Sequence, residues 1–232
     1  MPHPNKLDDL ARLHHHLLSE IVATGHAPSI AEMSHQLGWR DTVLRENLRA
    51  LEAYHGAVLH PHNDEVWVIH PFSLAPTNFW VSSSRGSWWG NCAWCSLGVA
   101  ALLQEDCTIH SRLGAEQLPV ELEIVDGQLR QKDLLIHFPI PMRQAWDNVI
   151  YTCSTMLLFA SETDIDRWCE QHGIGKGDVQ RAENIWTFSQ KWYGRHLDRD
   201  WRKWTQAEAK ALFTEFGLTH PVWQLEDTQG RF

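Results

Sequence analysis

The stretch NCAWCSLGVAALL, residues 91–103, contains two of the chain's five cysteines followed by eight small or apolar residues. Such a run predicts a buried helix that begins at the cysteines. Free backbone N–H groups and the helix dipole stabilise a thiolate at a helix N-terminus and raise its reactivity. We therefore expect Cys92 or Cys95 to be a nucleophile or a soft-metal ligand.

The C-x-x-C spacing alone does not identify the site. A zinc ribbon needs a second pair of cysteines, and a thioredoxin-like site needs a βαβ context, which is not evident here. Two small buried hydrophobic residues remain the structural alternative. Cys107 and Cys169 are expected to be packing residues, and Cys153 lies in an apolar run where a structural cysteine would be ordinary.

The residues after this stretch predict strands followed by helices. The predicted strands are CTIHSR (107–112), PVELEIV (119–125) with an Asp126-Gly127 turn, LLIHF (134–138) and NVIYTCSTMLLFA (148–160). The predicted helices begin at Ser161 with Asp164, run through Val179, Ala182, Ile185 and Trp186, and begin again at the capping box Thr205 and Glu208. This order predicts an α+β fold, with a mixed α/β domain around a small, mainly antiparallel sheet.

The residues before it predict a separate N-terminal domain. Leucines at three- and four-residue steps, the capping box Ser29 and Glu32, and the run 42–54 indicate three helices, and AVLH and EVWVIH (57–60 and 65–70) indicate a hairpin. Three helices and a hairpin suggest a winged-helix-like domain. We place the domains at 1–72 and 73–232, with the boundary in the proline-containing PFSLAPTNFW.

Composition limits the classes of partner. The net charge is −9, and residues 1–72 contain five basic and nine acidic residues, a net charge of −4. A DNA-binding domain needs clustered Lys and Arg, so nucleic acid is not an expected partner. No run reaches the ~18 to 20 apolar residues that a membrane span requires. The first residues do not resemble a signal peptide and the cysteines are odd in number, so we expect a cytoplasmic protein with reduced thiols.

Histidines and tryptophans are abundant but do not form a motif. His14, His15 and His16 occupy consecutive positions of a predicted helix and cannot all face one ion, which favours a solvated face over a metal site. The thirteen tryptophans are interpreted as core residues rather than as a ligand-binding box.

Three segments resemble a known family. AWCSLG (93–98), CTIHSRLGAEQLPVELEIV (107–125) and TCSTMLLFASETDIDRW (152–168) are similar, in order and spacing, to core segments of organomercurial (alkylmercury) lyases. The similarity covers roughly residues 79–172. The tail 178–225 resembles a wider alkylmercury-lyase-like group. Members of the family have a winged-helix-like domain before an α+β catalytic domain, so the chain is expected to be a divergent member.

The resemblance implies a site. The family's two catalytic cysteines fall on Cys95 and Cys153, and two thiolates suit the mercury of an R–Hg substrate. Coordination by both sulfurs weakens the carbon–mercury bond, and an acid must protonate the departing carbon. Mercury is substrate here, and no resident cofactor is implied. Small thiols are the expected acceptors of Hg(II).

The chain differs from the family at the position of the residue that donates the proton. The family's catalytic aspartate corresponds to Gly98, which has no proton to give. Ser96, Asp147 or a bound water are the candidate proton donors, and Cys92 is a candidate third thiol. The expected function is an organomercurial lyase-like enzyme.

Two alternatives remain from the sequence. One is a non-catalytic thiol-based sensor or regulator of soft metals or electrophiles, and the other is a cysteine-dependent enzyme acting on a non-mercurial substrate. The distance between the Cys95 and Cys153 sulfurs decides among these ideas, because one bridging ion requires the sulfurs within roughly 5 Å. The sequence does not indicate an oligomeric state.

Overall fold

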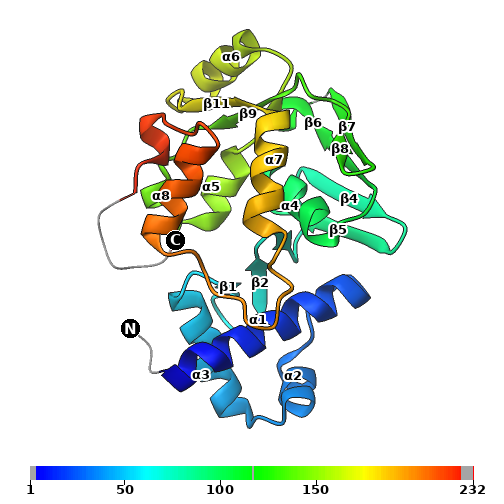
Figure 1. Cartoon of the computed structure of the whole chain (residues 1–232), viewed down its shortest axis with the longest axis vertical. Helices are drawn as coiled ribbons and strands as arrows, with labels where there is room; N and C mark the ends of the chain where they lie inside the picture. Colours follow the sequence, from blue (N-terminus) through cyan, green and yellow to red (C-terminus); the bar gives the residue numbers. More distant parts are fainter. Residues whose placement is uncertain (1–3, 117, 226–231) are drawn as a thin grey trace.

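The computed structural model describes residues 4–116, 118–225 and 232. Figure 1 shows the N-terminal helices at one end of the molecule and the sheets with the remaining helices at the other. The fold is α+β, as predicted, and every strand pairing in the described residues is antiparallel.

The N-terminal end has the three predicted helices and the predicted hairpin. These are α1 (Pro4–Thr24), α2 (Ile30–Leu37), α3 (Asp41–Ala53), β1 (Val58–Leu59) and β2 (Val66–Ile69). The capping box of Ser29 and Glu32 starts α2, as the sequence predicts. On α1 the apolar residues Leu10, Leu13, Leu17 and Ile21, at three- and four-residue steps, are buried. The elements therefore follow from apolar spacing and local caps.

The hairpin continues into a larger sheet than the sequence predicts. Within the described residues this sheet has eight strands in the order β1-β2-β3-β5-β4-β6-β7-β8. The added strands are β3 (Phe72–Ser73), β4 (Phe79–Ser83), β5 (Gly86–Gly90), β6 (Cys107–Arg112), β7 (Pro119–Val125) and β8 (Gln128–Leu129). Buried apolar residues of the N-terminal helices and of the sheet form one core, and Trp88 Nε1 donates to the Ile21 carbonyl oxygen at 2.8 Å. The predicted boundary at residue 72 falls in β3, and the division into two domains stays a prediction.

A buried helix lies between this sheet and a second layer of helices. All of α4 (Ala93–Leu103) is buried, as its apolar sequence predicts. It packs along α7 (Ala182–Tyr193), where Trp94 stacks on Phe188 with ring centroids 5.1 Å apart. A second sheet has three strands in the order β10-β9-β11, which are β10 (Leu158–Phe159), β9 (Leu135–Phe138) and β11 (Asp178–Arg181). The helices α6 (Glu162–His172) and α8 (Gln206–Glu215) follow in the C-terminal part of the chain.

Two predicted elements differ in the structure. The run 148–160 was predicted to be a strand, but it forms α5 (Val149–Thr155) and then the short β10 (Leu158–Phe159). The Asn148 side chain accepts the Tyr151 N–H and caps this helix, so a local cap outweighs the β-branched residues. The helix predicted to include Val179 begins at Ala182 instead. Residues Asp178–Arg181 form β11, which pairs along all of β9 (Leu135–Phe138).

Two further observations bear on partners. The described residues include no helix that is both long enough and apolar enough to cross a membrane. On α3, Arg45 and Arg49 bind the Asp64 carboxylate, with N···O distances of 3.2 Å and 2.7 Å. Both guanidinium groups are therefore already engaged by an acidic residue of the hairpin.

Candidate functional site

Two of the sulfurs belong to the start of α4. Cys92 is the N-cap residue, and its Sγ accepts the Cys95 backbone N–H at 3.3 Å. Cys95 lies in the first turn, and both side chains are buried. The predicted placement of the cysteines at a helix N-terminus is therefore confirmed.

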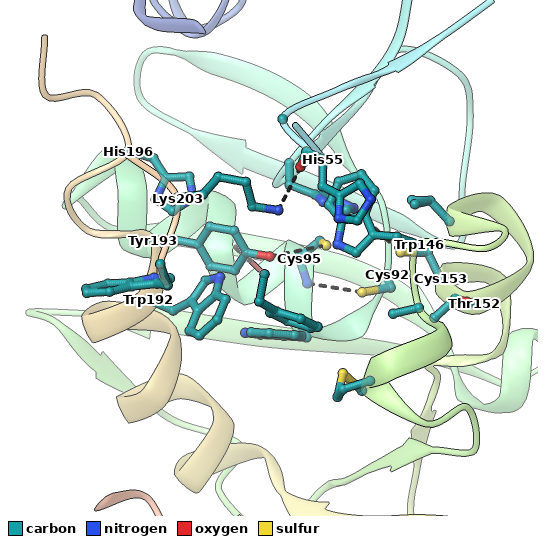
Figure 2. A pocket seen from close by; sticks show the side chains of 18 of the residues that line it. His55, Cys92, Cys95, Trp146, Thr152, Cys153, Trp192, Tyr193, His196 and Lys203 are labelled. Atoms are coloured by element: carbon teal, nitrogen blue, oxygen red, sulfur yellow. Dashed lines mark hydrogen bonds between the residues drawn. The ribbon is translucent and has the colours of Figure 1, made fainter. Parts of the chain in front are cut away.

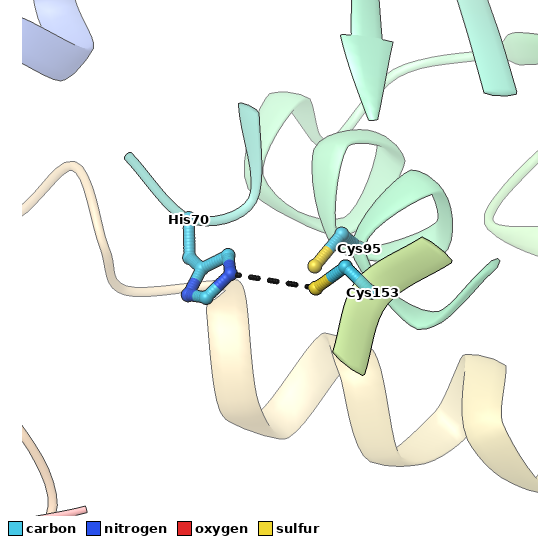
Figure 3. Close-up of side chains that lie close together, drawn as sticks. All are labelled: His70, Cys95 and Cys153. Carbon is cyan, nitrogen blue, oxygen red and sulfur yellow. Dashed lines mark hydrogen bonds between the residues drawn. The ribbon is translucent and has the colours of Figure 1, made fainter. Parts of the chain in front are cut away.

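Cys153 approaches from α5 and His70 from the end of β2. The donor atoms His70 Nε2, Cys95 Sγ and Cys153 Sγ all lie within 4.8 Å of one another. Figure 3 shows the three side chains gathered at one point. Cys153 Sγ is 3.8 Å from His70 Nε2. The two sulfurs are thus close enough for one atom to bridge them, and the imidazole supplies a third donor beside them.

His70 is held as a neutral ring. Burial lowers the pKa of His70 to about 4. Asn91 Nδ2 lies 3.2 Å from the same Nε2 and donates to its lone pair, so a metal bound at this nitrogen would take the place of that hydrogen bond. A neutral imidazole is the form that binds metals.

The three thiols titrate as one group. Burial opposes ionisation of Cys92, but hydrogen bonds from Cys153, Cys95 and the Cys95 backbone N–H outweigh it and lower the pKa of Cys92 well below its ordinary value. Burial and the charge of Cys92 raise the pKa of Cys95. Hydrogen bonds to Cys92 and Cys95, together with burial, raise the pKa of Cys153. These shifts make Cys92 the most readily ionised of the three thiols.

Tyr193, at the end of α7, reaches the same sulfurs. Its Oη is 3.7 Å from Cys95 Sγ. Burial and the charges of Cys95 and Cys92 raise the pKa of Tyr193 well above its ordinary value. Its phenol therefore remains protonated beside the thiols.

These groups line a cavity of about 70 Å³, seen from close by in Figure 2. Its wall is mainly aromatic, with five tryptophans: Trp94, Trp146, Trp192, Trp201 and Trp204. All five belong to the hydrophobic core or pack against it, as predicted, and they also border this cavity. A small, largely apolar space beside soft donors suits a small ligand with an apolar group.

A buried lysine closes one side of the cavity. Lys203 Nζ donates to the His55 carbonyl oxygen at 2.8 Å and lies 4.3 Å from the centre of the Trp146 ring. Burial lowers the pKa of Lys203 well below its ordinary value. This contact joins the C-terminal segment to the loop after α3 at the cavity wall.

His14 also lines the cavity, contrary to the solvated face predicted for His14 to His16. Its ring is buried and stacks on Trp201 with centroids 3.5 Å apart. The first helix is covered on this side by the C-terminal segment, which the sequence pattern of the helix does not reveal.

The predicted site residues divide into two groups. The structure brings Cys92, Cys95 and Cys153 together at the cavity. Ser96 is buried and donates to the Ala93 carbonyl oxygen at 2.8 Å, and Asp147 is exposed. Neither is among the described residues that line the cavity.

Sequence reasoning missed His70, Tyr193 and Lys203. His70 ends a predicted strand, and Tyr193 and Lys203 lie in the helical tail, so only their tertiary position makes them site residues. A weak signal was available in the WYGRHL segment (192–197), where polar and aromatic residues follow an amphipathic helix.

Comparison with known proteins gives two similarities. The family model described as alkylmercury lyase matches residues 72–194, just over half of the chain. Among solved structures, "Crystal structure of the mercury-bound form of MerB2" superposes with a TM-score of 0.62 at 18% identity, covering 84% of this chain and 98% of that chain. At this identity the likeness is one of fold. A comparison with curated proteins found no match.

Proposed function

Because this chain belongs to the alkylmercury lyase family, we propose that it is an organomercurial lyase that uses the Cys95 and Cys153 thiolates to cleave a carbon–mercury bond. The observation that carries the proposal is the convergence of His70 Nε2, Cys95 Sγ and Cys153 Sγ within 4.8 Å at one cavity. His70 follows β2, and Cys95 and Cys153 come from α4 and α5, so the three residues are remote in the chain.

The substrate arrives as R–Hg bound to a small thiol, R–Hg–SR′. Cys92, the most readily ionised of the three thiols, enters as the thiolate and takes the proton of Cys95, and Cys95 Sγ then bonds to mercury. Cys153 bonds as a second thiolate, and its proton leaves with the displaced R′SH. Mercury now carries R and two protein sulfurs, with His70 beside it as a neutral donor.

Cleavage is a protonolysis. An acid gives its proton to the carbon, and the electron pair of the carbon–mercury bond becomes the new carbon–hydrogen bond. R–H leaves, and Hg(II) stays on Cys95 and Cys153 until small thiols remove it. Two sulfur donors load electron density on mercury and so favour departure of the carbon.

The identity of the acid is a separate part of the proposal. Gly98 stands where the family resemblance places an aspartate, so another group must supply the proton. Ser96, Asp147 and a bound water remain hypotheses from the sequence. Ser96 already donates within α4, and Asp147 is exposed, so the geometry favours neither.

A cytoplasmic location belongs to the same proposal, since the mechanism needs reduced thiols and a supply of small thiols. A DNA-linked sensor is less well supported. The two arginines of α3 are bound to Asp64, and residues 1–72 have a net charge of −4.

The test is release of hydrocarbon from a simple organomercurial in excess small thiol. We expect turnover by the wild type and loss of at least about 100-fold in rate for Cys95→Ala and for Cys153→Ala, because nucleophilic catalysis is removed. Cys169→Ala is the matched control, since Cys169 is buried but does not line the cavity. Wild-type protein that binds one equivalent of R–Hg and releases no hydrocarbon would refute catalysis.

A further inference from the structure

Tyr193 and Gly98 occupy adjoining space at the site. A Cβ atom placed on Gly98 would lie 2.5 Å from Tyr193 Cδ2 and 2.6 Å from Tyr193 Cε2. It would also lie 3.0 Å from Pro71 Cβ. The phenol ring therefore fills the volume into which any side chain at position 98 would project, one helical turn after Cys95.

The ring also brings a hydroxyl to the reacting sulfur. Tyr193 Oη is 3.7 Å from Cys95 Sγ, and the side chain lines the cavity. A mercury atom bonded to Cys95 Sγ lies one bond length from the atom that Oη already contacts. With that mercury directed into the cavity that both side chains line, its organic substituent lies beside the hydroxyl.

The position of the hydroxyl is fixed by packing. Tyr193 is 3% exposed, and its ring meets Trp94 edge-on with centroids 5.8 Å apart and His196 at 5.0 Å. A donor held in place before the substrate arrives loses little entropy in the reaction.

We propose that the Tyr193 hydroxyl is the acid that protonates the leaving carbon, in the place that a side chain at position 98 would otherwise take. This inference rests on the proposed organomercurial cleavage. The Tyr193 O–H bond breaks, its proton forms the new carbon–hydrogen bond with the electron pair of the carbon–mercury bond, and a phenolate remains.

The cycle closes without an oxidant or a reductant. Two small thiols, R′SH, remove the metal as Hg(SR′)₂. One of their protons returns to the Tyr193 phenolate and the other to a cysteine of the group. One thiolate is left, as at the start.

The test is Tyr193→Phe, which keeps the ring in place and removes only the hydroxyl. We expect hydrocarbon release to fall by about 100-fold or more, the range of general acid catalysis. Binding of one equivalent of R–Hg should persist, and intact-protein mass spectrometry should show an adduct that still contains R. Tyr151→Phe is the matched control, because Tyr151 is an exposed tyrosine of α5.

A second pair of variants tests whether the Tyr193 ring occupies the volume that a side chain at position 98 would enter. Tyr193→Ala should be inactive, and adding Gly98→Asp to it should restore hydrocarbon release at least tenfold, because the carboxyl then enters the space that the ring has left. Circular dichroism checks that both variants fold.

The outcomes separate the two proposals. Tyr193→Phe with a rate within threefold of the wild type would overturn the role of Tyr193 and leave the lyase function standing. A wild type that holds R–Hg without releasing hydrocarbon would overturn both.

Discussion

His70, Cys95 and Cys153 come from distant parts of the chain and present one nitrogen and two sulfurs to a common point. Two sulfurs suffice to hold a two-coordinate mercury atom. In the proposed cleavage, the neutral nitrogen beside them would add a third contact as the carbon departs. His70 is therefore expected to matter more for holding the metal than for removing a proton.

Replacement of His70 tests this role. We expect His70→Ala to retain Hg(II) about tenfold less tightly in competition with a small dithiol, since one donor is lost. His137→Ala is a close control. His137 Nε2 lies 3.7 Å from Cys169 Sγ, a similar buried contact between imidazole and thiol at which no second sulfur converges among the described residues. Equal retention by wild type and His70→Ala would exclude a metal contact.

The cysteines were predictable and their partners were not. The apolar run that follows Cys92 and Cys95 predicts that they lie at a helix N-terminus. Only the family resemblance indicates Cys153 as a site residue. His70, Tyr193 and Lys203 have no local pattern, because each enters the site from a segment whose own periodicity is explained by packing. The residues next to His70, Tyr193 and Lys203 in the sequence do not indicate which distant side chains these three contact in the fold.

At the scale of secondary structure, the short helix α5 positions Cys153. It has seven residues, with Val149, Thr152 and Thr155 among them, so its intrinsic helix propensity is low. The Asn148 cap and burial of one face compensate for this. The sequence favours a strand here because the same residues prefer extended structure, whereas the structure shows that the Asn148 cap prevails.

The cap of α5 should therefore influence activity. We expect Asn148→Ala to cost about 0.5 to 2 kcal/mol of stability and to slow hydrocarbon release by shifting Cys153. Ser161→Ala removes the equivalent cap of α6, whose first turn does not line the cavity, and should cost similar stability with little loss of rate. Denaturant unfolding and turnover of both variants would measure the two effects. Identical rates for the two variants would contradict a positioning role for α5.

Over the whole molecule, the α+β class and most of the helix boundaries followed from apolar periodicity and capping boxes. The continuity of the sheet could not be predicted in this way. The pairing of β2 with β3 and of β3 with β5 joins segments that the sequence assigns to different domains. The C-terminal segment adds to this continuity. Arg202 binds Asp8 at 2.6 Å, and Lys203 binds the His55 carbonyl oxygen.

Several buried histidines make stability depend on pH. Burial lowers the pKa of His55 and His137 to about 4, and that of His196 to about 3. Below about pH 6.5 the unfolded chain binds protons at these histidines that the folded chain does not, so stability is lost as pH falls toward 4. Each histidine steepens the loss by up to about 1.4 kcal/mol per pH unit.

Urea unfolding between pH 7 and pH 4 would measure this slope. His137→Gln should flatten it relative to the wild type, whereas His62→Gln, at an exposed position, should not. Carboxylates contribute equally to all three proteins, so the difference isolates the histidine. Parallel curves for the wild type and His137→Gln would refute the assignment.

The tryptophans that line the cavity make intrinsic fluorescence a probe of the proposed reaction. Indole emission is quenched when a heavy atom settles nearby, and five of the thirteen indoles lie on this wall. Loading with mercury should dim the fluorescence without any added dye, and its recovery should time the departure of the metal. Turnover could then be followed in the same cuvette from the arrival of the substrate to the release of its product.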